Sequence, residues 1–458
     1  MPFPLKLILS VVIVVLMALW VMLPARFDVV APRLGMPVIV KPGATIELRI
    51  ISTLPFWQPQ WQVSLALREQ QVPLQITKQK INFNKQLVSV QIPETVAAAS
   101  YSIIVSDGQN EISRPKAVHV VTEFPDQVSI VQMADLPTLG RGDGDQRLQQ
   151  IIDEINIINP ELVLMTGDIA YGGTWDQYHR LLAAMKKINA PVIAAPGNHE
   201  YEGWAGYLTL LGEPYHSVQY GNYQIIGLNS GHGRDQLTEA QFDWLLNELE
   251  NLDGRVPLVQ LHHPMHHRPD LRGYVANHVA DMVRAFKRMG VPIVLSGHWH
   301  GDAVYDARGN DRRDTWDFPG IPYVVTTAAG ADLREKYSSS PLHHGYRLIQ
   351  LDKSKLVSYT YDMDRDGERD ATSSIPMGKL RSMPQANGSI LVENELNESF
   401  PNARVQISIP GNNVSLVPDK GTLVNRYIND GQSYYEIEFP LAANSQQQIQ
   451  LISESPRI

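Results

Sequence analysis

The stretch LVLMTGDIAY at residues 162–171 places an apolar strand directly before a glycine, an aspartate and a tyrosine. Two similar stretches flank it, VSIVQMAD at 128–135 and VIAAPGNHE at 192–200. Amphipathic helical patterns around 146–158 and 175–188 separate the three. Buried strands that alternate with helices are typical of a largely parallel sheet with helices on its faces. The sequence therefore predicts an α/β fold around these strands.

The same alternation continues along the chain, with strands at 258–261 and 293–295 and helices near 238–252 and 274–289. In such sheets, ligands bind beyond the carboxyl ends of the strands. Each of the five strands is followed there by side chains that can bind a metal: Asp135; Asp168; Asn198 and His199; His262 and His263; His298 and His300. Five such placements in chain order predict a metal site at this edge of the sheet.

Composition narrows the chemistry of that site. The chain has 458 residues, enough for two or three domains, and it contains 14 histidines but no cysteine. Disulfides, cysteine nucleophiles and thiolate metal sites are therefore excluded, and imidazole, carboxylate, amide and phenol ligands remain. With 39 basic and 48 acidic residues the net charge is −9, so no specific nucleic-acid partner is expected.

The order of these motifs resembles that of a known family. The motifs look like those of the calcineurin-like metallophosphoesterases. In chain order they are Asp135, Gly-Asp-x-x-Tyr ending at Tyr171, Gly-Asn-His-Glu at 197–200, His262, and Gly-His-x-His ending at His300. Tyr171 is similar to the tyrosine of the purple acid phosphatase branch. The resemblance implies an α/β metallophosphoesterase core, a four-layer α/β/β/α sandwich, flanked by all-β domains.

The resemblance also implies a binuclear metal centre in which the Asp168 carboxylate bridges the two ions. One metal would be held by Asp135, Asp168, Tyr171 and His300. The second would be held by Asp168, Asn198, His262 and His298. Two cations about 3.5–4 Å apart can share a hydroxide and clamp both oxygens of a displacement at phosphorus. A tyrosinate favours Fe(III), which the resemblance pairs with Fe, Zn or Mn.

The first motif departs from the family pattern. Metallophosphoesterases generally place histidine two residues after the first aspartate, and purple acid phosphatases place glycine, but here that position is Pro137. Proline cannot bind a metal, so Tyr171 would supply the missing ligand. Whether Pro137 distorts Asp135 is left open by the sequence.

Three further histidines are candidates for catalysis. By the resemblance, His199 would lie near the leaving-group oxygen as a proton donor or charge stabiliser. His266 and His267 follow the ligand His262 in the same loop and could bind phosphate or transfer protons. A solvated loop is the alternative reading for these two.

These features predict a phosphomonoesterase of the purple acid phosphatase type that uses a metal-activated hydroxide on small phosphate esters. A phosphodiesterase acting on cyclic nucleotides, nucleic acid ends or envelope phospholipids is the alternative. A membrane-tethered binding protein with a vestigial metal centre is a third reading, supported only by Pro137.

The ends of the chain differ from its centre. Residues 7–23 form an apolar run that would be roughly 26 Å long as a helix. We therefore expect residues 1–26 to be a signal anchor or signal peptide, and the rest of the chain to be exported into a bacterial periplasm or cell envelope. Short alternating runs predict a β-sandwich at 27–124, ahead of a catalytic domain at 125–376. A β-rich module is expected at 377–458.

A separate acidic motif, D-x-D-x-D-G, follows the predicted strand at 355–361. Asp362, Asp364 and Asp366 match the start of a calcium loop, but the twelfth position, which is glutamate in an EF-hand, is Ser373. Calcium binding and a solvated acidic turn are both open on sequence.

Overall fold

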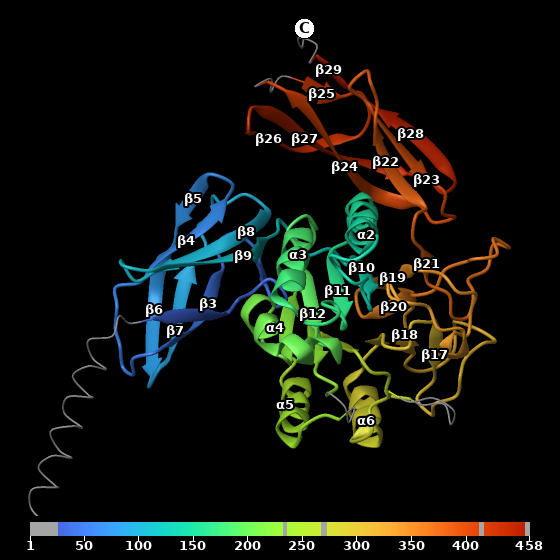
Figure 1. Cartoon of the computed structure of the whole chain (residues 1–458), viewed down its shortest axis with the longest axis horizontal. Helices are drawn as coiled ribbons and strands as arrows, with labels where there is room; N and C mark the ends of the chain where they lie inside the picture. Colours follow the sequence, from blue (N-terminus) through green and yellow to red (C-terminus); the bar gives the residue numbers. More distant parts are fainter. Residues whose placement is uncertain (1–25, 232–235, 267–272, 412–415, 454–458) are drawn as a thin grey trace, which may run out of the picture.

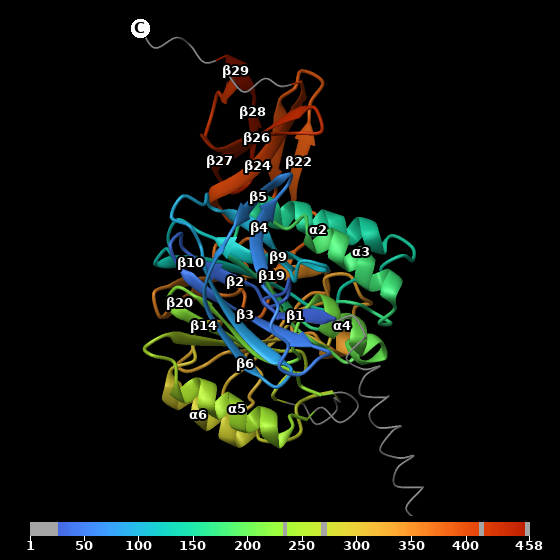
Figure 2. The same ribbon diagram turned by 90° about the vertical axis from the view of Figure 1, so that its left-hand side faces the viewer.

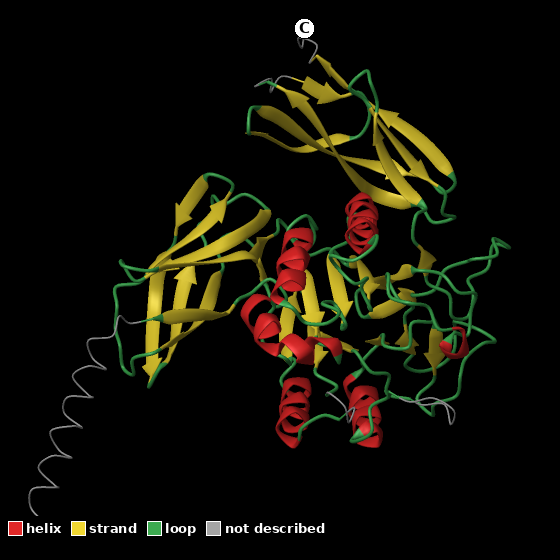
Figure 3. Cartoon of the chain, viewed as in Figure 1, coloured by secondary structure: helices red, strands yellow, loops and turns green. Residues whose placement is uncertain are grey.

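The computed structural model describes residues 26–231, 236–266, 273–411 and 416–453 of the chain. Figure 1 shows a sandwich of strands at one side, a core with helices in the centre and a second group of strands above the core. Figure 3 shows that the two outer groups consist of strands and loops, whereas the helices belong to the core.

The first sheet of the core brings three of the predicted strand ends together. Strands β10, β11 and β12 are parallel neighbours, and β19 runs antiparallel beside β10. The carboxyl ends of the three parallel strands therefore meet at one edge. The order is β12 (Val192–Ala195), β11 (Leu162–Thr166), β10 (Gln127–Met133), β19 (Gly345–Asp352) and β20 (Lys355–Ser358), and β21 (Ile375–Pro376) also pairs with β19.

The second sheet supplies the remaining two strand ends. Strands β14, β15, β16 and β18 are parallel, so the residues that follow β15 and β16 also lie at a common edge. Its order is β13 (His216–Tyr220), β14 (Tyr223–Leu228), β15 (Val256–Leu261), β16 (Val294–Ser296), β18 (Tyr323–Val325) and β17 (Ala303–Tyr305).

The two sheets lie face to face between two layers of helices (Figure 2). Apolar residues of both sheets, such as Leu164 and Leu258, form the core between them. The opposite face of the first sheet packs against α2 (Gly144–Ile158), α3 (Trp175–Met185) and α4 (Trp204–Leu210), and that of the second against α5 (Glu239–Glu250) and α6 (Val279–Met289). The predicted four-layer α/β/β/α architecture is confirmed.

Side-chain caps explain where two of these helices begin. The hydroxyl of Thr174 accepts a hydrogen bond from Gln177 N at the start of α3, and Thr238 does the same for Gln241 N in α5. The expectation that the last core helix begins near residue 274 is wrong, because α6 begins at Val279. The preceding residue, His278, has a left-handed backbone (φ 58°), which interrupts a helix.

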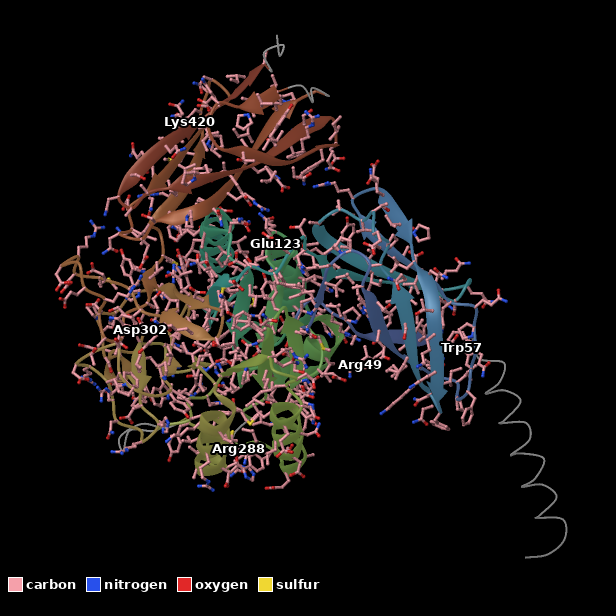
Figure 4. All side chains as sticks on the ribbon, turned by 180° about the vertical axis from the view of Figure 1, so that it is seen from behind. Arg49, Trp57, Glu123, Arg288, Asp302 and Lys420 are labelled. Carbon is pink, nitrogen blue, oxygen red and sulfur yellow. The ribbon has the colours of Figure 1, made fainter. Side chains whose placement is uncertain are left out.

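The N-terminal strands form two facing sheets around their own apolar core. Arg49 of β3 joins this sandwich to the core through two 2.8 Å hydrogen bonds to Glu213 (Arg49 is labelled in Figure 4). One sheet contains β1 (Phe27–Ala31), β3 (Thr45–Ser52), β7 (Lys85–Gln91) and β6 (Gln75–Asn82). The other contains β2 (Val38–Val40), β9 (Glu111–Val120), β8 (Ala99–Ser106), β4 (Gln62–Leu67) and β5 (Gln70–Pro73).

The C-terminal strands pack their apolar side chains onto α2, so Val405 and Phe439 share one core with Ile151. A side-chain contact, Asn159 Nδ2 to Asn402 O at 3.0 Å, adds to this junction. The strands are β22 (Leu380–Pro384), β23 (Ile390–Asn394) and β28 (Ser445–Ile449) in one sheet; β24 (Phe400–Pro410), β27 (Gln432–Leu441) and β26 (Thr422–Asn429) in another; and the pair β25 (Leu416–Pro418) and β29 (Leu451–Ser453).

The apolar run at 7–23, on which export was predicted, lies outside the described residues. Within the described ranges, no helix is both long and apolar enough to cross a bilayer.

Candidate metal centre

The loops that follow β10, β11 and β16 are held together through their backbones. Asp135 N donates to Gly167 O at 3.1 Å, and Leu136 N donates to Asp168 O at 2.9 Å. The Asp135 Oδ2 atom accepts a 2.8 Å hydrogen bond from the backbone N–H of His298, in the loop that follows β16 of the second sheet. Residues far apart in the sequence are thereby brought to one point at the edge of both sheets.

Four of the seven predicted ligands have a left-handed backbone, with φ of 53° at Asp135, 51° at Asp168, 70° at His298 and 54° at His300. This region costs free energy for any residue other than glycine and is concentrated at functional sites. Gly197 adds a close approach, because a Cβ there would collide with Asp168 Oδ1. The strained backbone turns the side chains of these loops toward each other.

Carboxylate and imidazole atoms converge in this region. Asp168 Oδ2 lies 3.2 Å from His262 Nε2, and Asp135 Oδ1 lies 3.2 Å from His300 Nε2. His262 Nε2 also lies 3.1 Å from His298 Nδ1. Ligand atoms of Asp135, Asp168 and His262 all fall within 4.8 Å of one another. Five of the seven predicted ligands are thus brought together by short side-chain distances.

Backbone carbonyls fix which nitrogen each histidine can offer. His262 Nδ1 donates to Thr166 O at 2.9 Å, and His300 Nδ1 donates to Asp332 O at 2.5 Å. A carbonyl oxygen accepts only, so Nδ1 carries the proton in both rings. Each Nε2 is left to face a carboxylate, where it can carry a proton or, once that proton is lost, bind a metal; this is the arrangement that orients metal-binding histidines.

The electrostatics favour a positive charge between these groups. Burial lowers the pKa of His262, but the Asp168 and Asp135 carboxylates and the Thr166 carbonyl together raise this pKa to about 10. The pKa of His300 is likewise raised, because the Asp135 carboxylate and the Asp332 carbonyl together oppose the effect of burial. The pKa of His298 is held well below its usual value, chiefly by burial. The carboxylates therefore attract protons to positions where a metal cation would compete with them.

Two buried oxygens are consistent with a metal that binds here. Asp135 Oδ1 and Asn198 Oδ1 are shielded from solvent; the first has the His300 imidazole nearby at 3.2 Å, and the second accepts no hydrogen bond from the described part of the chain. A buried polar atom without a partner is costly unless a ligand satisfies it. Carboxylate, amide and imidazole groups suit Zn, Mn and Fe. The donors present fit a binuclear centre of the kind that the sequence predicts.

Pro137 does not displace Asp135 from this arrangement. Its ring packs against Gly330, where an added Cβ would lie 2.6 Å from Pro137 Cδ. Gly330 also supports the backbone of the aspartate, because Gly330 N donates a hydrogen bond to Asp135 O at 3.2 Å. The question that the sequence left open is answered, because Asp135 keeps its contacts to His298 and His300.

Tyr171 and His199 lie next to each other at this edge. Their rings stack with centroids 3.9 Å apart and planes inclined by 24°. His199 N donates to Asp168 Oδ1 at 3.0 Å, and its Nε2 lies 3.8 Å from Asp168 Oδ2. Tyr171 thus contacts His199, which in turn contacts Asp168, the proposed bridging carboxylate. The role of Tyr171 as a metal ligand stays a prediction.

Another predicted catalytic histidine, His266, is not brought into this group. His266 is buried, and its ring packs edge-on against Tyr323 with centroids 4.6 Å apart, near Tyr305 and Gly309. These contacts give it a packing role under β17 and β18 and do not support the predicted catalytic role. His267 lies outside the described residues.

Glu200 has a function that the sequence reasoning missed. Its carboxylate is fully buried and accepts four backbone hydrogen bonds, from Asp168 N (3.0 Å), Ile169 N (2.8 Å), Ala170 N (2.9 Å) and Gly197 N (2.5 Å). Burial raises the pKa of Glu200, and these donors oppose the rise. The side chain joins the loops that carry Asp168 and Asn198. Its position in the Gly-Asn-His-Glu motif was the available signal.

Comparisons with known proteins agree with this geometry. The model of the family described as calcineurin-like phosphoesterase matches residues 128–302. The chain is 30% identical over 225 residues to the 3',5'-cyclic adenosine monophosphate phosphodiesterase CpdA of Haemophilus influenzae, covering 44% of this chain and 75% of that protein. It is 24% identical to the serine/threonine-protein phosphatase CPPED1 of Danio rerio, over 59% of this chain and 92% of that one.

A third relative, the 3',5'-cyclic-nucleotide phosphodiesterase of Nostoc sp., is 32% identical over 30% of this chain. The chain spans 57% of that protein and 62% of a Synechococcus relative. Among solved structures, a purple acid phosphatase from yellow lupin aligns with 77% of this chain and 74% of its own, at 13% identity and a TM-score of 0.46. The CpdA match, with which the family model agrees, shows that the chain belongs to the calcineurin-like phosphoesterases.

Proposed function

We propose that this protein is a binuclear metal-dependent phosphoesterase whose preferred substrates are small phosphate monoesters. The observation that carries the proposal is the convergence of ligand atoms of Asp135, Asp168 and His262 within 4.8 Å, with a buried, unsatisfied oxygen on Asn198. Bound metals would supply Lewis acidity toward the phosphoryl oxygens and would lower the pKa of a coordinated water. The apolar run at 7–23 supports the further proposal that the enzyme acts in the cell envelope.

The residues of the chain have separate tasks in this reaction. Asp135, Asp168, Asn198, His262, His298 and His300 would hold the metals, with Tyr171 as the additional oxygen ligand. His199 would donate a proton to the leaving alkoxide, because its imidazole is partly open to solvent and lies beside Asp168. The stacked Tyr171 ring and the backbone bond to Asp168 would keep this imidazole in place.

Phosphodiester hydrolysis is the second candidate. The names of the Haemophilus and Nostoc relatives, both cyclic-nucleotide phosphodiesterases, favour it. Tyr171 supports the monoesterase, because it follows the purple acid phosphatase motif rather than the general family pattern.

A pair of chromogenic substrates tests the proposal. We expect metal-loaded protein to hydrolyse para-nitrophenyl phosphate with a kcat/KM at least about tenfold above that for bis(para-nitrophenyl) phosphate, a preference of roughly 1.4 kcal/mol in transition-state binding. The Asp168→Asn variant, prepared identically, controls for contaminating phosphatases. The reverse preference would establish the diesterase. Failure to hydrolyse either ester with both metals bound would support the non-catalytic binding protein.

The identity of the first metal can be tested through Tyr171. If its phenolate binds Fe(III), iron-loaded protein should show a visible charge-transfer band that is lost in Tyr171→Phe while iron content stays within about twofold. Tyr201→Phe is a matched control, because the Tyr201 hydroxyl accepts a hydrogen bond from Asn229 Nδ2 and Tyr201 belongs to the neighbouring turn. An unchanged spectrum in Tyr171→Phe would show that Tyr171 does not bind the metal.

A further inference from the structure

The acidic motif after β20 forms a compact loop between the catalytic core and the C-terminal strands. Carboxylate oxygens of Asp362, Asp364 and Asp366 lie within 4.8 Å of one another. The loop lies between β20 and β21, which are drawn below β22 and β23 in Figure 1. Three acidic side chains this close repel one another, and a bound cation would remove that repulsion.

Each of the three carboxylates uses one oxygen to shape the loop. Asp362 Oδ2 accepts from Gly367 N at 3.1 Å, Asp364 Oδ1 from Asp366 N at 3.3 Å, and Asp366 Oδ1 from Glu368 N at 2.8 Å. The second oxygen of each is left for another partner.

Asp362 gives a second indication, besides the grouping of the three carboxylates, that a ligand binds in this loop. Its side chain is only 9% exposed, and its Oδ1 is buried without a hydrogen bond from any described residue. Asn397, from the loop between β23 and β24, donates Nδ2 to Asp362 Oδ2 at 2.7 Å and to Asp362 O at 2.9 Å. Asn397 Oδ1 is also buried and accepts nothing from the described chain. Two buried oxygens on adjoining side chains therefore lack a partner.

The nearby cations do not neutralise this cluster. Arg365 Nη2 donates to Glu395 O at 2.7 Å, and Arg369 pairs with Glu398 at 2.6 Å. Within the described ranges, no ion pair joins a lysine or arginine to Asp362, Asp364 or Asp366. Five acidic residues lie between 362 and 370, against two arginines that are directed elsewhere.

We propose that Asp362, Asp364, Asp366 and Asn397 bind one calcium ion that joins the catalytic core to the C-terminal strands. Carboxylate and amide oxygens on an irregular loop suit Ca²⁺, which accepts six to eight oxygen ligands in a flexible geometry. The EF-hand glutamate at position twelve is replaced by Ser373, which is buried and whose carbonyl binds Tyr361 N and Arg347. Asn397 provides an oxygen from a separate segment instead.

Calorimetric titration of the full chain with CaCl₂, after EGTA treatment, tests this site. We expect one strong site per chain, with affinity weakened at least about tenfold in Asp364→Asn and in Asn397→Ala. Asp364 is exposed, so its substitution leaves the packing intact. Asp430→Asn, in the exposed turn between β26 and β27, is the control and should bind as wild type does.

Two further measurements separate this site from the catalytic centre. Calcium binding should persist in Asp168→Asn. Terbium bound in place of calcium should show tyrosine-sensitised emission that falls several-fold in Tyr361→Phe, because the Tyr361 hydroxyl contacts Asn397 N at 3.3 Å. Binding that is lost in Asp168→Asn but kept in Asp364→Asn would overturn the proposal. Wild-type affinity in Asn397→Ala would overturn the link to the C-terminal strands, and absence of binding would overturn the site.

Discussion

Asp168→Asn is expected to lose both metals and to reduce kcat/KM for para-nitrophenyl phosphate by about 10³-fold or more. The carboxylate lies 3.2 Å from His262 Nε2, and its other oxygen accepts a hydrogen bond from His199 N. In the proposed centre it is the one side chain assigned to both metals. An amide has similar size but supplies one neutral oxygen and an NH₂ group, which cannot bridge two cations. Metal analysis and steady-state kinetics on the same preparation measure both effects.

His199→Ala is the matched comparison for this prediction. His199 contributes its imidazole beside Asp168, whereas its contact to the carboxylate is made through backbone N and survives the substitution. We therefore expect two metals to remain bound and kcat to fall by about 10²-fold, the usual range for loss of a proton donor. Full activity in Asp168→Asn would refute the proposed centre. Loss of metal in His199→Ala would show that His199 is a metal ligand rather than a proton donor.

The fold and most of the centre could be predicted because both depend on local patterns. Most of the predicted ligands lie within four residues of the end of a buried strand, and parallel strands bring their carboxyl ends to one edge. His266 shows the limit of that reasoning. It lies four residues after His262, but the chain turns at Pro264 and His266 packs against Tyr323. Sequence distance from a ligand does not determine the direction of a side chain in an irregular loop.

Contacts between distant loops could not be predicted from the sequence. The Asn397 amide meets Asp362 from 35 residues away, and no periodic pattern relates the two segments. The carboxylate of Glu200 meets Ile169 N across 31 residues. In both cases, the partner depends on how two irregular segments are placed by the packing of the strands around them.

Glu200 is the residue outside the predicted ligand set whose replacement should have the largest effect. Its carboxylate accepts only, and both oxygens are fully used by N–H groups from the two loops. In Glu200→Gln, one oxygen becomes an NH₂ group that faces two N–H donors. Two buried N–H groups then lose their acceptor, each at a cost of about 1–3 kcal/mol.

We therefore expect Glu200→Gln to lower the free energy of unfolding by about 2–6 kcal/mol in urea denaturation, and to weaken metal binding because N–H groups of the Asp168 loop lose their acceptor whichever oxygen is replaced. Glu202→Gln is the matched control: it makes the same change two residues later, in the same short helix η1 (His199–Gly203), at an exposed side chain. It should shift stability by less than about 0.5 kcal/mol. Equal stability and metal content in the two variants would show that the loops carrying Asp168 and Asn198 hold their positions without the buried carboxylate.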